Sequence, residues 1–328
     1  MKAFFAVLVV SLVSFADAQD SAGALKLEKN IPLEGVKGRI DHMAADVRGQ
    51  RLFVAALGNN TVEVVDLKAG KKSDSLSGFA EPQGIAYVPE FDKLFVANGS
   101  DGTCRVLDGH SLKTAATVSV GDDADNVRYD EKAKQIYVGY GDGALAVIDA
   151  KSDKKIADIK LSAHPESFRL ETNGVRIFVN VPGSDQIAVV DREKRTVVET
   201  WPLKEARANF PMILDEPNHR LFIGCRHPAR MLILDTATGK TMSSVEISGD
   251  TDDLFYDASR SQIYVSCGAG VIDVIKLGGT DARSLPMRIS TVSGARTSLF
   301  SPERDELYLA VRAGLISSGA AIRVYKPQ

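Results

Sequence analysis

The residues best suited to chemistry in this sequence are four acids, spaced at intervals close to 42 residues or twice that. They are Asp41, Asp125, Glu166 and Asp252. Four carboxylates in one place repel one another unless a cation, a shared proton or an arginine compensates their charge. Oxygen-rich surroundings without thiols suit calcium or magnesium better than zinc or copper. One prediction is therefore that these four side chains hold a hard cation, with calcium as a possible ion.

Two histidines stand beside these acids in the sequence. His42 follows Asp41 directly, and His164 precedes Glu166 by two residues. An imidazole titrates near neutral pH and can take a proton from a bound water or substrate. With a metal ion polarising a carbonyl group nearby, either histidine would act as the general base of a hydrolase or isomerase.

Arginines, amides and other polar residues accompany the same positions. We predict ligand-binding roles for Arg39, Gln83, Asn126, Asn209, Asp253, Arg296, Arg226 and His227. Amide oxygens would complete a calcium shell of roughly 6–8 oxygens. If Arg39 and Arg296 dominate instead, the site binds a carboxylate or phosphate group bidentately. A third interpretation is that the acids and arginines neutralise one another around trapped water.

A repeat of 41 to 44 residues explains why residues so far apart in sequence should meet. It reads RLFV at Arg51–Val54 and returns, little changed, from Lys93, Gln135, Arg176, Arg220, Gln262 and Glu306. A period of this size, made of β-branched and aromatic residues, is typical of one β-propeller blade per repeat. Seven copies predict an all-β protein, a seven-bladed β-propeller with four-stranded antiparallel blades. The predicted site residues lead from one blade into the next, at the mouth of the central funnel.

The fourth repeat shows how a blade is expected to form. Its strands are predicted at Ser167–Leu170, Val175–Asn180, Gln186–Val190 and Thr196–Trp201. Core strands are apolar along their length because neighbouring blades cover both of their faces. Asn, Asp and Gly lie between the strands because these residues tolerate turn geometry.

The last repeat is short, because no fourth strand follows Ala321–Tyr325. We predict that Leu25–Leu33 supplies it, so that the N- and C-terminal strands pair and close the ring. Closure removes the exposed sheet edge that would otherwise invite aggregation. Residues 19–328 would then form a single domain.

A second set of acids repeats too regularly to form a site. Each precedes the repeated core motif by five residues, and they are Asp46, Asp130, Glu171, Asp215 and Asp257. Acids favour turns because their side chains bond the backbone two or three residues ahead. We therefore predict that these five cap turns around the rim.

The first residues are typical of a secretory signal peptide. Lys2 is the positive residue, Phe4–Val13 is apolar, and Ala16-Asp17-Ala18 is a small-x-small cleavage site. We predict cleavage after residue 18 and a secreted or periplasmic location. The apolar run is shorter than the ~20 residues needed to span a bilayer, so no membrane span is expected.

Composition and charge narrow the choice of partners. A net charge of −3 gives no broad attraction to nucleic acid or to anionic membranes. The chain also has no basic stripe interleaved with aromatic residues, which nucleic-acid binding commonly uses. The three cysteines, Cys104, Cys225 and Cys267, are interpreted as small buried residues rather than a disulfide. We expect a monomer that binds a small anionic ligand or a peptide.

The repeat resembles that of the YncE-like, YVTN-repeat β-propellers, a family of exported bacterial proteins. The resemblance rests on the [RKQ]-[LI]-[FY]-[VI] core and on third strands that end as in Val62–Asp66, Ala146–Asp149 and Ala188–Asp191. It covers essentially the whole chain after residue 18 and implies the fold more than an activity, because most of the family has no assigned biochemical role. A looser similarity to gluconolactonase and paraoxonase propellers implies a calcium ion in the central funnel. Covalent haem, carried by more distant propellers, is not expected because C-x-x-C-H is missing.

Three functions stay open at this point. The first is a binding or scaffold protein whose carboxylate-rich funnel is the binding site. The second is a calcium-assisted, lactonase-like hydrolase or isomerase that uses the same funnel. The third, nucleic-acid binding, is suggested only by the family. The chain has no G-x-S-x-G elbow, P-loop or H-E-x-x-H motif, which lowers the weight of the common hydrolase mechanisms.

Overall fold

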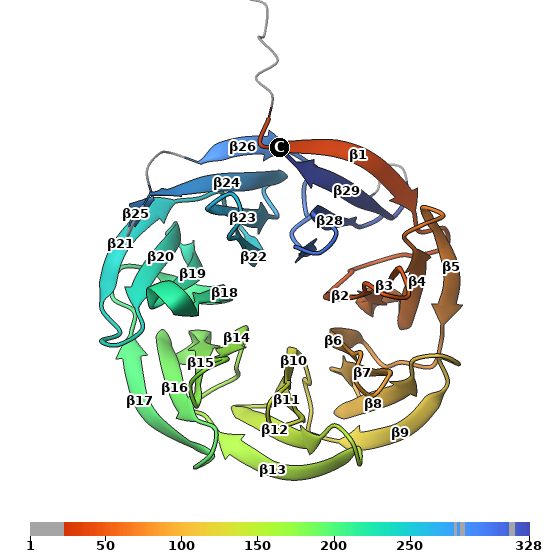
Figure 1. Cartoon of the computed structure of the whole chain (residues 1–328), viewed down its shortest axis with the longest axis horizontal. Coiled ribbons are helices and arrows are strands. Elements are labelled where there is room, and N and C mark those ends of the chain that lie inside the picture. Colours follow the sequence, from red (N-terminus) through yellow and green to blue (C-terminus); the bar gives the residue numbers. More distant parts are fainter. Residues whose placement is uncertain (1–22, 279–280, 283–285, 315–318) are drawn as a thin grey trace, which may run out of the picture.

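Seven antiparallel sheets form a ring around a central axis; the first strand of each of blades 1 to 6 is innermost, and in blade 7 the innermost strand is β27 (Ser298–Ser301) (Figure 1). The structure is a computed structural model that describes residues 23–278, 281–282, 286–314 and 319–328. The predicted signal peptide, residues 1–18, lies outside these residues. The predicted fold class, a seven-bladed β-propeller, is confirmed.

The first four blades each consist of four consecutive strands, ordered from the axis outward. Blade 1 comprises β2 (Met43–Asp46), β3 (Arg51–Ala56), β4 (Thr61–Asp66) and β5 (Lys71–Leu76). Blade 2 comprises β6 (Pro82–Val88), β7 (Lys93–Asn98), β8 (Thr103–Asp108) and β9 (Thr114–Ser119). Blade 3 comprises β10 (Val127–Asp130), β11 (Gln135–Tyr140), β12 (Ala144–Asp149) and β13 (Lys154–Lys160). Blade 4 comprises β14 (Phe168–Leu170), β15 (Arg176–Val181), β16 (Gln186–Asp191) and β17 (Thr196–Pro202).

Blade 5 keeps this plan, whereas blades 6 and 7 vary it. Blade 5 comprises β18 (Arg207–Asp215), β19 (Arg220–His227), β20 (Ala229–Asp235) and β21 (Thr241–Glu246). Blade 6 comprises β22 (Thr251–Asp257), β23 (Gln262–Cys267), β24 (Val271–Gly278) and β26 (Met287–Ser290), with the short β25 (Asp281–Ala282) also paired to β24. Blade 7 comprises β27 (Ser298–Ser301), β28 (Glu306–Val311), β29 (Ala321–Pro327) and β1 (Leu25–Pro32). Three 3-10 turns lie at η1 (Leu57–Asn59), η2 (Pro182–Ser184) and η3 (Glu216–Asn218).

The repeated motif forms the second strand of each blade, where both faces are buried. In β3, Leu52 and Val54 pack in a cluster shared with blade 7, whereas Phe53 packs in a cluster shared with blade 2. Successive side chains of a strand point to opposite faces, so each motif joins two interblade cores. This is why the motif is apolar at successive positions, while the residues of the outermost strand β5 are exposed or part-buried.

The regularly repeating acids stabilise turns and the first residue of the motif. Asp46 accepts a hydrogen bond from the backbone N–H of Gly49 and forms an ion pair with Arg51, whose Nη2 lies 2.7 Å from its carboxylate. The pair Asp215–Arg220 repeats this arrangement in blade 5 at 2.5 Å. The prediction that these acids cap turns is confirmed for Asp46, whereas Asp215 accepts a hydrogen bond from the side-chain amide of Asn218 within its turn.

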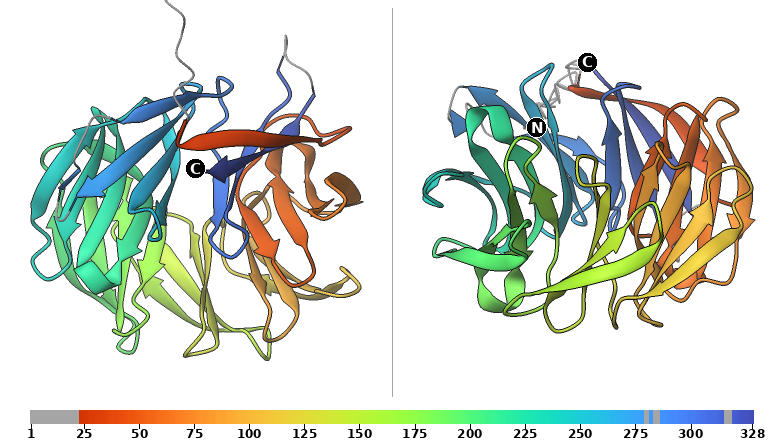
Figure 2. Two further views of the ribbon diagram at one scale, coloured as in Figure 1. Left: turned by 45° about the horizontal axis from the view of Figure 1, so that its top comes forward. Right: turned by 60° about the horizontal axis from the view of Figure 1, so that its bottom comes forward.

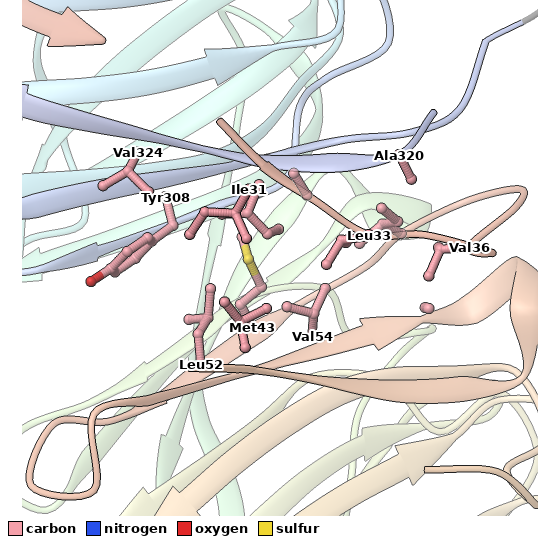
Figure 3. Close-up of a cluster of buried hydrophobic side chains, with 14 of the residues drawn as sticks. Ile31, Leu33, Val36, Met43, Leu52, Val54, Tyr308, Ala320 and Val324 are labelled. Carbon is pink, nitrogen blue, oxygen red and sulfur yellow. The ribbon is translucent and has the colours of Figure 1, made fainter. Parts of the chain in front are cut away.

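The ring closes through the first and last described strands. β1 pairs antiparallel with β29, from Leu25 opposite Pro327 to Pro32 opposite Ala321, and the two lie side by side in both views of Figure 2. Ile31 and Leu33 are 1% exposed, and Figure 3 shows them between the side chains of blade 7 and blade 1. The predicted closure by residues 25–33 is confirmed.

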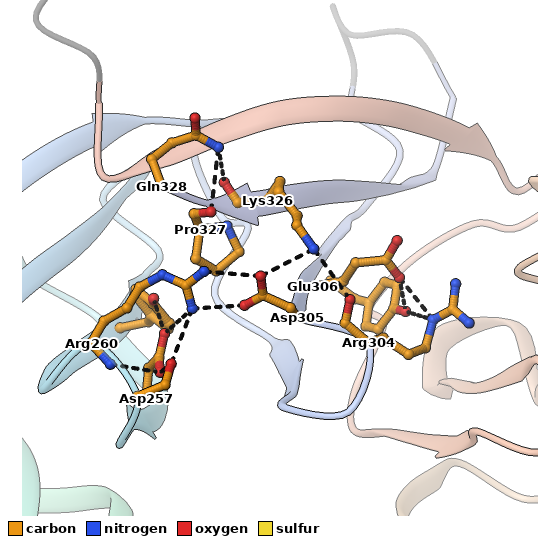
Figure 4. Close-up of polar contacts among 11 residues, drawn as sticks. Asp257, Arg260, Arg304, Asp305, Glu306, Lys326, Pro327 and Gln328 are labelled. Carbon is orange, nitrogen blue, oxygen red and sulfur yellow. Dashed lines mark hydrogen bonds and ion pairs between the residues drawn. The ribbon is translucent and has the colours of Figure 1, made fainter.

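Charged side chains tie blade 7 to blade 6 beside this closure (Figure 4). Arg260 of blade 6 contacts Asp257 at 3.0 Å and Asp305 of blade 7 at 2.7 Å. Lys326 of β29 lies 3.1 Å from the same Asp305. The turn between β27 and β28 is thus held from both sides.

Two further observations bear on the sequence predictions. Cys104, Cys225 and Cys267 are free and buried, as expected. Within the described residues, no helix is long and apolar enough to cross a membrane.

Candidate functional site

The predicted site residues lie where the chain passes from one blade to the next. The backbone N–H groups of Asp41, Asp125 and Glu166 donate to carbonyl oxygens of the neighbouring core strands, at 2.8, 2.9 and 3.0 Å. These bonds extend the pairing of blades 1, 3 and 4 by one step beyond their inner strands. The three acids therefore occupy equivalent places at the same end of the central axis.

Their side chains surround one small cavity of about 20 Å³. It is lined by Arg39, Asp41, His42, Asp125, Asn126, Glu166, Ser167, Phe210, Asp252 and Asp253. All four predicted metal-binding acids and one of the two predicted histidines thus meet here. Residues from five different blades contribute, although Asp41 and Asp253 are more than 200 positions apart in the sequence.

Asp252 is balanced by two arginines. Arg226 Nη2 lies 2.5 Å from its Oδ1, and Arg296 Nε lies 3.2 Å from its Oδ2. The guanidinium of Arg226 also stacks on the ring of Phe210, with its central carbon 3.6 Å from the ring centroid. Because both carboxylate oxygens are engaged, Asp252 is part of an ion network rather than a free metal ligand.

Asp41, His42 and Asp125 form a second group. His42 Nε2 lies 3.8 Å from Asp41 Oδ1 and 3.6 Å from Asp125 Oδ1. The other oxygen of Asp41 lies 2.6 Å from Arg39 Nη2. Asp41 is only 2% exposed and Asp125 only 8%. Two buried carboxylates therefore each direct one oxygen toward the same imidazole nitrogen.

Burial shifts the protonation equilibria of this group. Burial, and then repulsion from Asp41, raises the pKa of Asp125 well above its usual range. Burial also raises the pKa of Asp41, although Arg39 opposes the shift. Burial, and then the positive charge of Arg128, lowers the pKa of His42 to about 4. The imidazole is therefore neutral at neutral pH, with a lone pair available to a metal ion or a proton.

Glu166 has neither arginine nor lysine as an ion-pair partner within the described part of the chain. Burial, and then repulsion from Asp252, raises its pKa to about 7. Near neutral pH this carboxyl group is divided between its neutral and charged forms. It can accept or release a proton there, as a general acid or base must.

Two predicted amide ligands have other roles. Asn209 is fully buried between blades 4 and 5, where its amide donates to Asn180 Oδ1 at 2.9 Å and to the carbonyl oxygen of Gln186 at 3.1 Å. β18 shifts register between Asn209 and Met212, which turns Asn209 away and places Phe210 at the cavity instead. Gln83 donates to Asp123 of the next blade at 3.3 Å and does not line the cavity. The structure thus corrects the predicted placement of both.

His164 and His227 also lie apart from the cavity. His164 Nδ1 is 2.8 Å from the carbonyl oxygen of Gly141, so the ring is held against the turn between β11 and β12. His227 is exposed at the end of β19. Its neighbour Arg226 alone reaches the cavity acids. The sequence predicted the same role for Arg226 and His227 because they are adjacent. Successive side chains of a strand point to opposite faces, however, so only one of the two can point to the cavity.

A larger channel adjoins the cavity along the axis. Its volume is about 300 Å³, and the inner strands of six blades line it. His42 and Asp253 belong to both spaces, so they mark the boundary. The backbone N–H of Ser298 donates to Asp253 Oδ2 at 2.8 Å and fixes that carboxylate.

The channel contains two arginines that the sequence interpretation missed, Arg128 and Arg169. Both come three residues after a cavity acid, in a column that elsewhere reads Ala44, Ala86, Ile213, Phe255 and Leu299. A charged pair in an otherwise apolar column was the available signal.

Neither arginine has a full set of acceptors. Arg128 donates to the carbonyl oxygen of Val127 at 2.8 Å and to Asn126 Oδ1 at 2.9 Å, and Arg169 makes only a long contact of 3.4 Å to the carbonyl oxygen of Phe168. The Nε atoms of both are buried and donate to no described residue. Burial, and then repulsion from Arg128, lowers the pKa of Arg169 to about 9. The pair would gain from a negative charge in the channel.

Calcium does not fit the arrangement that the sequence predicted. A calcium site uses roughly 6–8 oxygen ligands. Here both oxygens of Asp252 contact arginines, one oxygen of Asp41 contacts Arg39, and an imidazole lies between Asp41 and Asp125. The four acids therefore do not form an all-oxygen cage.

Comparison with known proteins supports the resemblance but assigns no activity. No family model matches the chain. The chain is 20% identical over 235 residues to the uncharacterized protein YncE of Salmonella typhimurium, a match that covers 66% of this chain and 65% of YncE. YncE of Salmonella typhi matches to the same extent. The match thus spans slightly less than two thirds of these relatives, and it agrees with a YncE-like propeller.

Two solved structures share the fold. A chain of the hydrazine synthase of Kuenenia stuttgartiensis has a TM-score of 0.75 at 18% identity, covering 88% of this chain and 97% of that one. A chain of the mitotic checkpoint complex has a TM-score of 0.77 at 11% identity, covering 99% of both. Such low identities establish the fold alone.

Proposed function

We propose that this protein is an exported binding protein that holds a small anionic ligand in the central channel of its propeller. The observation that carries the proposal is the pair Arg128 and Arg169, which line the channel and whose buried Nε groups have no acceptor among the described residues. Their like charges repel, and Asp253, which lines the same channel, is a single carboxylate against two guanidinium groups. Export is supported by the signal-like residues 1–18.

The channel also indicates the chemistry of the ligand. A guanidinium fork matches the two oxygens of a carboxylate or phosphate group. Tyr87, Tyr129 and Phe255 line the same space, and the two tyrosine hydroxyls are already bonded to Asp92 and Glu90. These side chains therefore offer mainly apolar surface. A volume of about 300 Å³ is at the small end of ligand pockets. The best fit is a small acid with an apolar or aromatic body.

Calorimetric titration of the metal-free protein with benzoate, phenyl phosphate and inorganic phosphate tests this proposal. We expect the aromatic anions to bind more tightly than inorganic phosphate. The substitution Arg169→Gln should weaken binding at least about 10-fold, because a hydrogen bond between charged groups contributes roughly 1.5–3 kcal/mol. Arg48→Gln, at an exposed residue outside the channel, is the control and should bind as the wild type does.

The outcome that contradicts the proposal is equally clear. If none of the three anions gives saturable binding, or if Arg169→Gln binds them as well as the wild type, the channel is not an anion site. Unfolding curves of both variants should match the wild type's, so that a loss of binding is not a loss of folding.

A metal-assisted hydrolase or isomerase is the second candidate. The observation in its favour is Glu166, whose pKa of about 7 suits a general acid or base beside His42 and Asp125. Incubation of the protein with a simple lactone and an aryl ester distinguishes the two functions. Turnover that Glu166→Gln abolishes would favour the enzyme, and binding without turnover would favour the binding protein.

A further inference from the structure

We infer that Asp41, His42 and Asp125 form a binding site for a divalent transition-metal ion such as Zn²⁺ or Mn²⁺. The ligand set differs from the four acids expected from the sequence. It includes an imidazole, and it leaves out Asp252, whose oxygens contact arginines.

The distances among the three side chains suit one small ion. One ligand atom from each of them lies within 4.8 Å of the other two, and His42 Nε2 is 3.6 and 3.8 Å from the nearest carboxylate oxygens. An ion that binds nitrogen and oxygen at about 2.0–2.2 Å keeps its ligands about 3–3.6 Å apart. The imidazole nitrogen needs to approach each carboxylate by only a few tenths of an ångström, and the two carboxylate oxygens, within 4.8 Å of each other, need to approach by no more than about an ångström.

A buried oxygen without a partner points into the site. Asp125 is 8% exposed, and its Oδ1, the atom 3.6 Å from His42 Nε2, accepts no hydrogen bond from any described residue. An unpartnered buried carboxylate oxygen costs free energy that a bound cation would offset. This observation is independent of the clustering of acids.

The opposite oxygens of both carboxylates are held by neighbours. Arg39 Nη2 lies 2.6 Å from Asp41 Oδ2, and the Asn126 amide donates to Asp125 Oδ2 at 3.4 Å. Asn126 is fixed in turn, because its Oδ1 accepts a hydrogen bond from Arg128 at 2.9 Å. Metal sites commonly have such outer contacts, which orient the ligands before the ion binds.

Size and charge also agree with one ion. The cavity of about 20 Å³ holds roughly one water molecule, since a water needs about 10–15 Å³. Arg39 balances Asp41, whereas Asp125 has only the neutral imidazole of His42 within ion-pair distance in the described chain. A dication would supply the missing positive charge.

The donor set selects the metal. An imidazole with two carboxylates and no thiolate suits Zn²⁺, Mn²⁺, Fe²⁺ or Co²⁺, whereas calcium prefers oxygen ligands throughout. Only three ligands come from the described residues, so further positions stay open to water or to an acid group. Because His42 lines both the cavity and the channel, a ligand in the channel could reach the ion. The metal site itself does not depend on anion binding.

Titration of chelator-treated protein tests the site. Calorimetry with Zn²⁺, Mn²⁺ and Ca²⁺ separately should give one Zn²⁺ or Mn²⁺ per chain, with calcium bound at least about 10-fold more weakly. The unfolding temperature should rise with Zn²⁺ or Mn²⁺ as the ion stabilises the folded state. Asp125→Asn should weaken Zn²⁺ binding at least about 10-fold, by comparison with other metal sites.

Matched variants separate the site from general electrostatics. Asp122→Asn removes an exposed acid three residues from Asp125 and should leave metal binding unchanged. Arg169→Gln should also retain it, so that failure of the anion proposal and failure of the metal proposal can be told apart. If Asp125→Asn does not fold, His42→Gln serves instead, with visible absorption of bound Co²⁺ as the readout. That spectrum should change when the imidazole is lost.

Three results would overturn the inference. They are the absence of saturable binding by Zn²⁺, Mn²⁺ and Co²⁺, a preference for calcium that His42→Gln leaves intact, and equal Zn²⁺ affinity in wild type, Asp125→Asn and His42→Gln. Loss of Zn²⁺ affinity in Asp122→Asn to the same degree as in Asp125→Asn would also overturn it, since binding would then follow overall charge.

Discussion

Neighbouring acids around the funnel differ in how their negative charge is balanced. Asp252 contacts two arginines, whereas Glu166 contacts none of the described arginines or lysines. The same burial therefore has different consequences for each. A carboxylate with a fixed cation contributes to structure, while one without a cation is free to exchange a proton or to bind a ligand.

Glu166 should make stability depend on pH. Its pKa is about 7 in the folded protein, raised from an ordinary value of 4.5. A carboxyl group with a raised pKa holds its proton more tightly when folded, so it stabilises the fold fully below about pH 4.5, and this contribution is lost as the pH rises through about 7. We expect the unfolding temperature of metal-free protein to fall between about pH 5 and pH 8, and to fall less in Glu166→Gln.

Calorimetric scans across that pH range measure the effect. Glu28→Gln, at an exposed residue of β1, is the control and should follow the wild-type curve. Parallel curves for wild type and Glu166→Gln would show that the group does not titrate as expected.

The sequence predicted site residues at positions that differ from one repeat to the next. It missed Arg128 and Arg169, which lie within inner strands. Asp41, His42, Asp125 and Glu166 do meet, because equivalent positions of successive blades face one axis. The predicted placement of Asn209 was wrong because a register shift in β18, which no local sequence motif indicates, moves this residue between blades. Which acids have arginine partners also depends on side-chain geometry across blades, which the repeat does not encode.

At the level of strands, the residues that lead into each inner strand determine how closely neighbouring blades can approach. β6 shifts register between Pro82 and Ile85, and Gly84 falls within this irregular stretch. A side chain at residue 84 would place its Cβ 2.0 Å from the carbonyl oxygen of Asp125 in the next blade. Glycine is therefore required for blade 2 to lie against the backbone of the proposed metal site.

The substitution Gly84→Ala should displace Asp125 and disturb the cavity. We expect a loss of about 1–3 kcal/mol in the free energy of unfolding, typical of overpacking, together with weaker Zn²⁺ binding. Urea unfolding and metal titration measure the two effects. Gly249→Ala is the matched control, since no atom lies within 4 Å of the position its Cβ would take. Equal behaviour of the two variants would mean that the close approach at Gly84 is not structurally important.

The strands themselves were largely predictable from the sequence. In blade 4 the expected Val175–Asn180 and Gln186–Val190 correspond to β15 at Arg176–Val181 and β16 at Gln186–Asp191. Apolar runs of a buried strand and turn residues between them determine such bounds. The inner strands were harder to predict, because polar funnel residues and register shifts interrupt their alternation.

For the whole molecule, stability should depend on the contact between β1 and its neighbours. Ile31 is 1% exposed in the cluster of Figure 3, whereas Leu27 of the same strand is 46% exposed. Ile31→Ala should lower the free energy of unfolding by about 2–5 kcal/mol, because it removes buried apolar surface and leaves a cavity. Leu27→Ala should change it by no more than about 0.5 kcal/mol.

Urea unfolding can be followed by the fluorescence of Trp201, which lies in blade 4. It reports whether removal of the Ile31 side chain at the ring closure also destabilises the distant part of the ring. A transition in blade 4 that Ile31→Ala leaves unchanged would mean that the ring does not unfold as one unit. Equal stability of the two variants would show that β1 contributes little to holding the blades together.

Of the described strands, β1, which completes blade 7, is made first, and its partner β29 is made last. β1 ends at Pro32 and β29 begins at Ala321, so roughly 290 residues separate them. At a synthesis rate of about 5–20 residues per second, that interval corresponds to roughly 15–60 s. Throughout this time the ring cannot close, and the growing chain lacks its final interblade contacts. Such a delay would suit the proposed export, because a chain that folds late can still be threaded through a membrane channel.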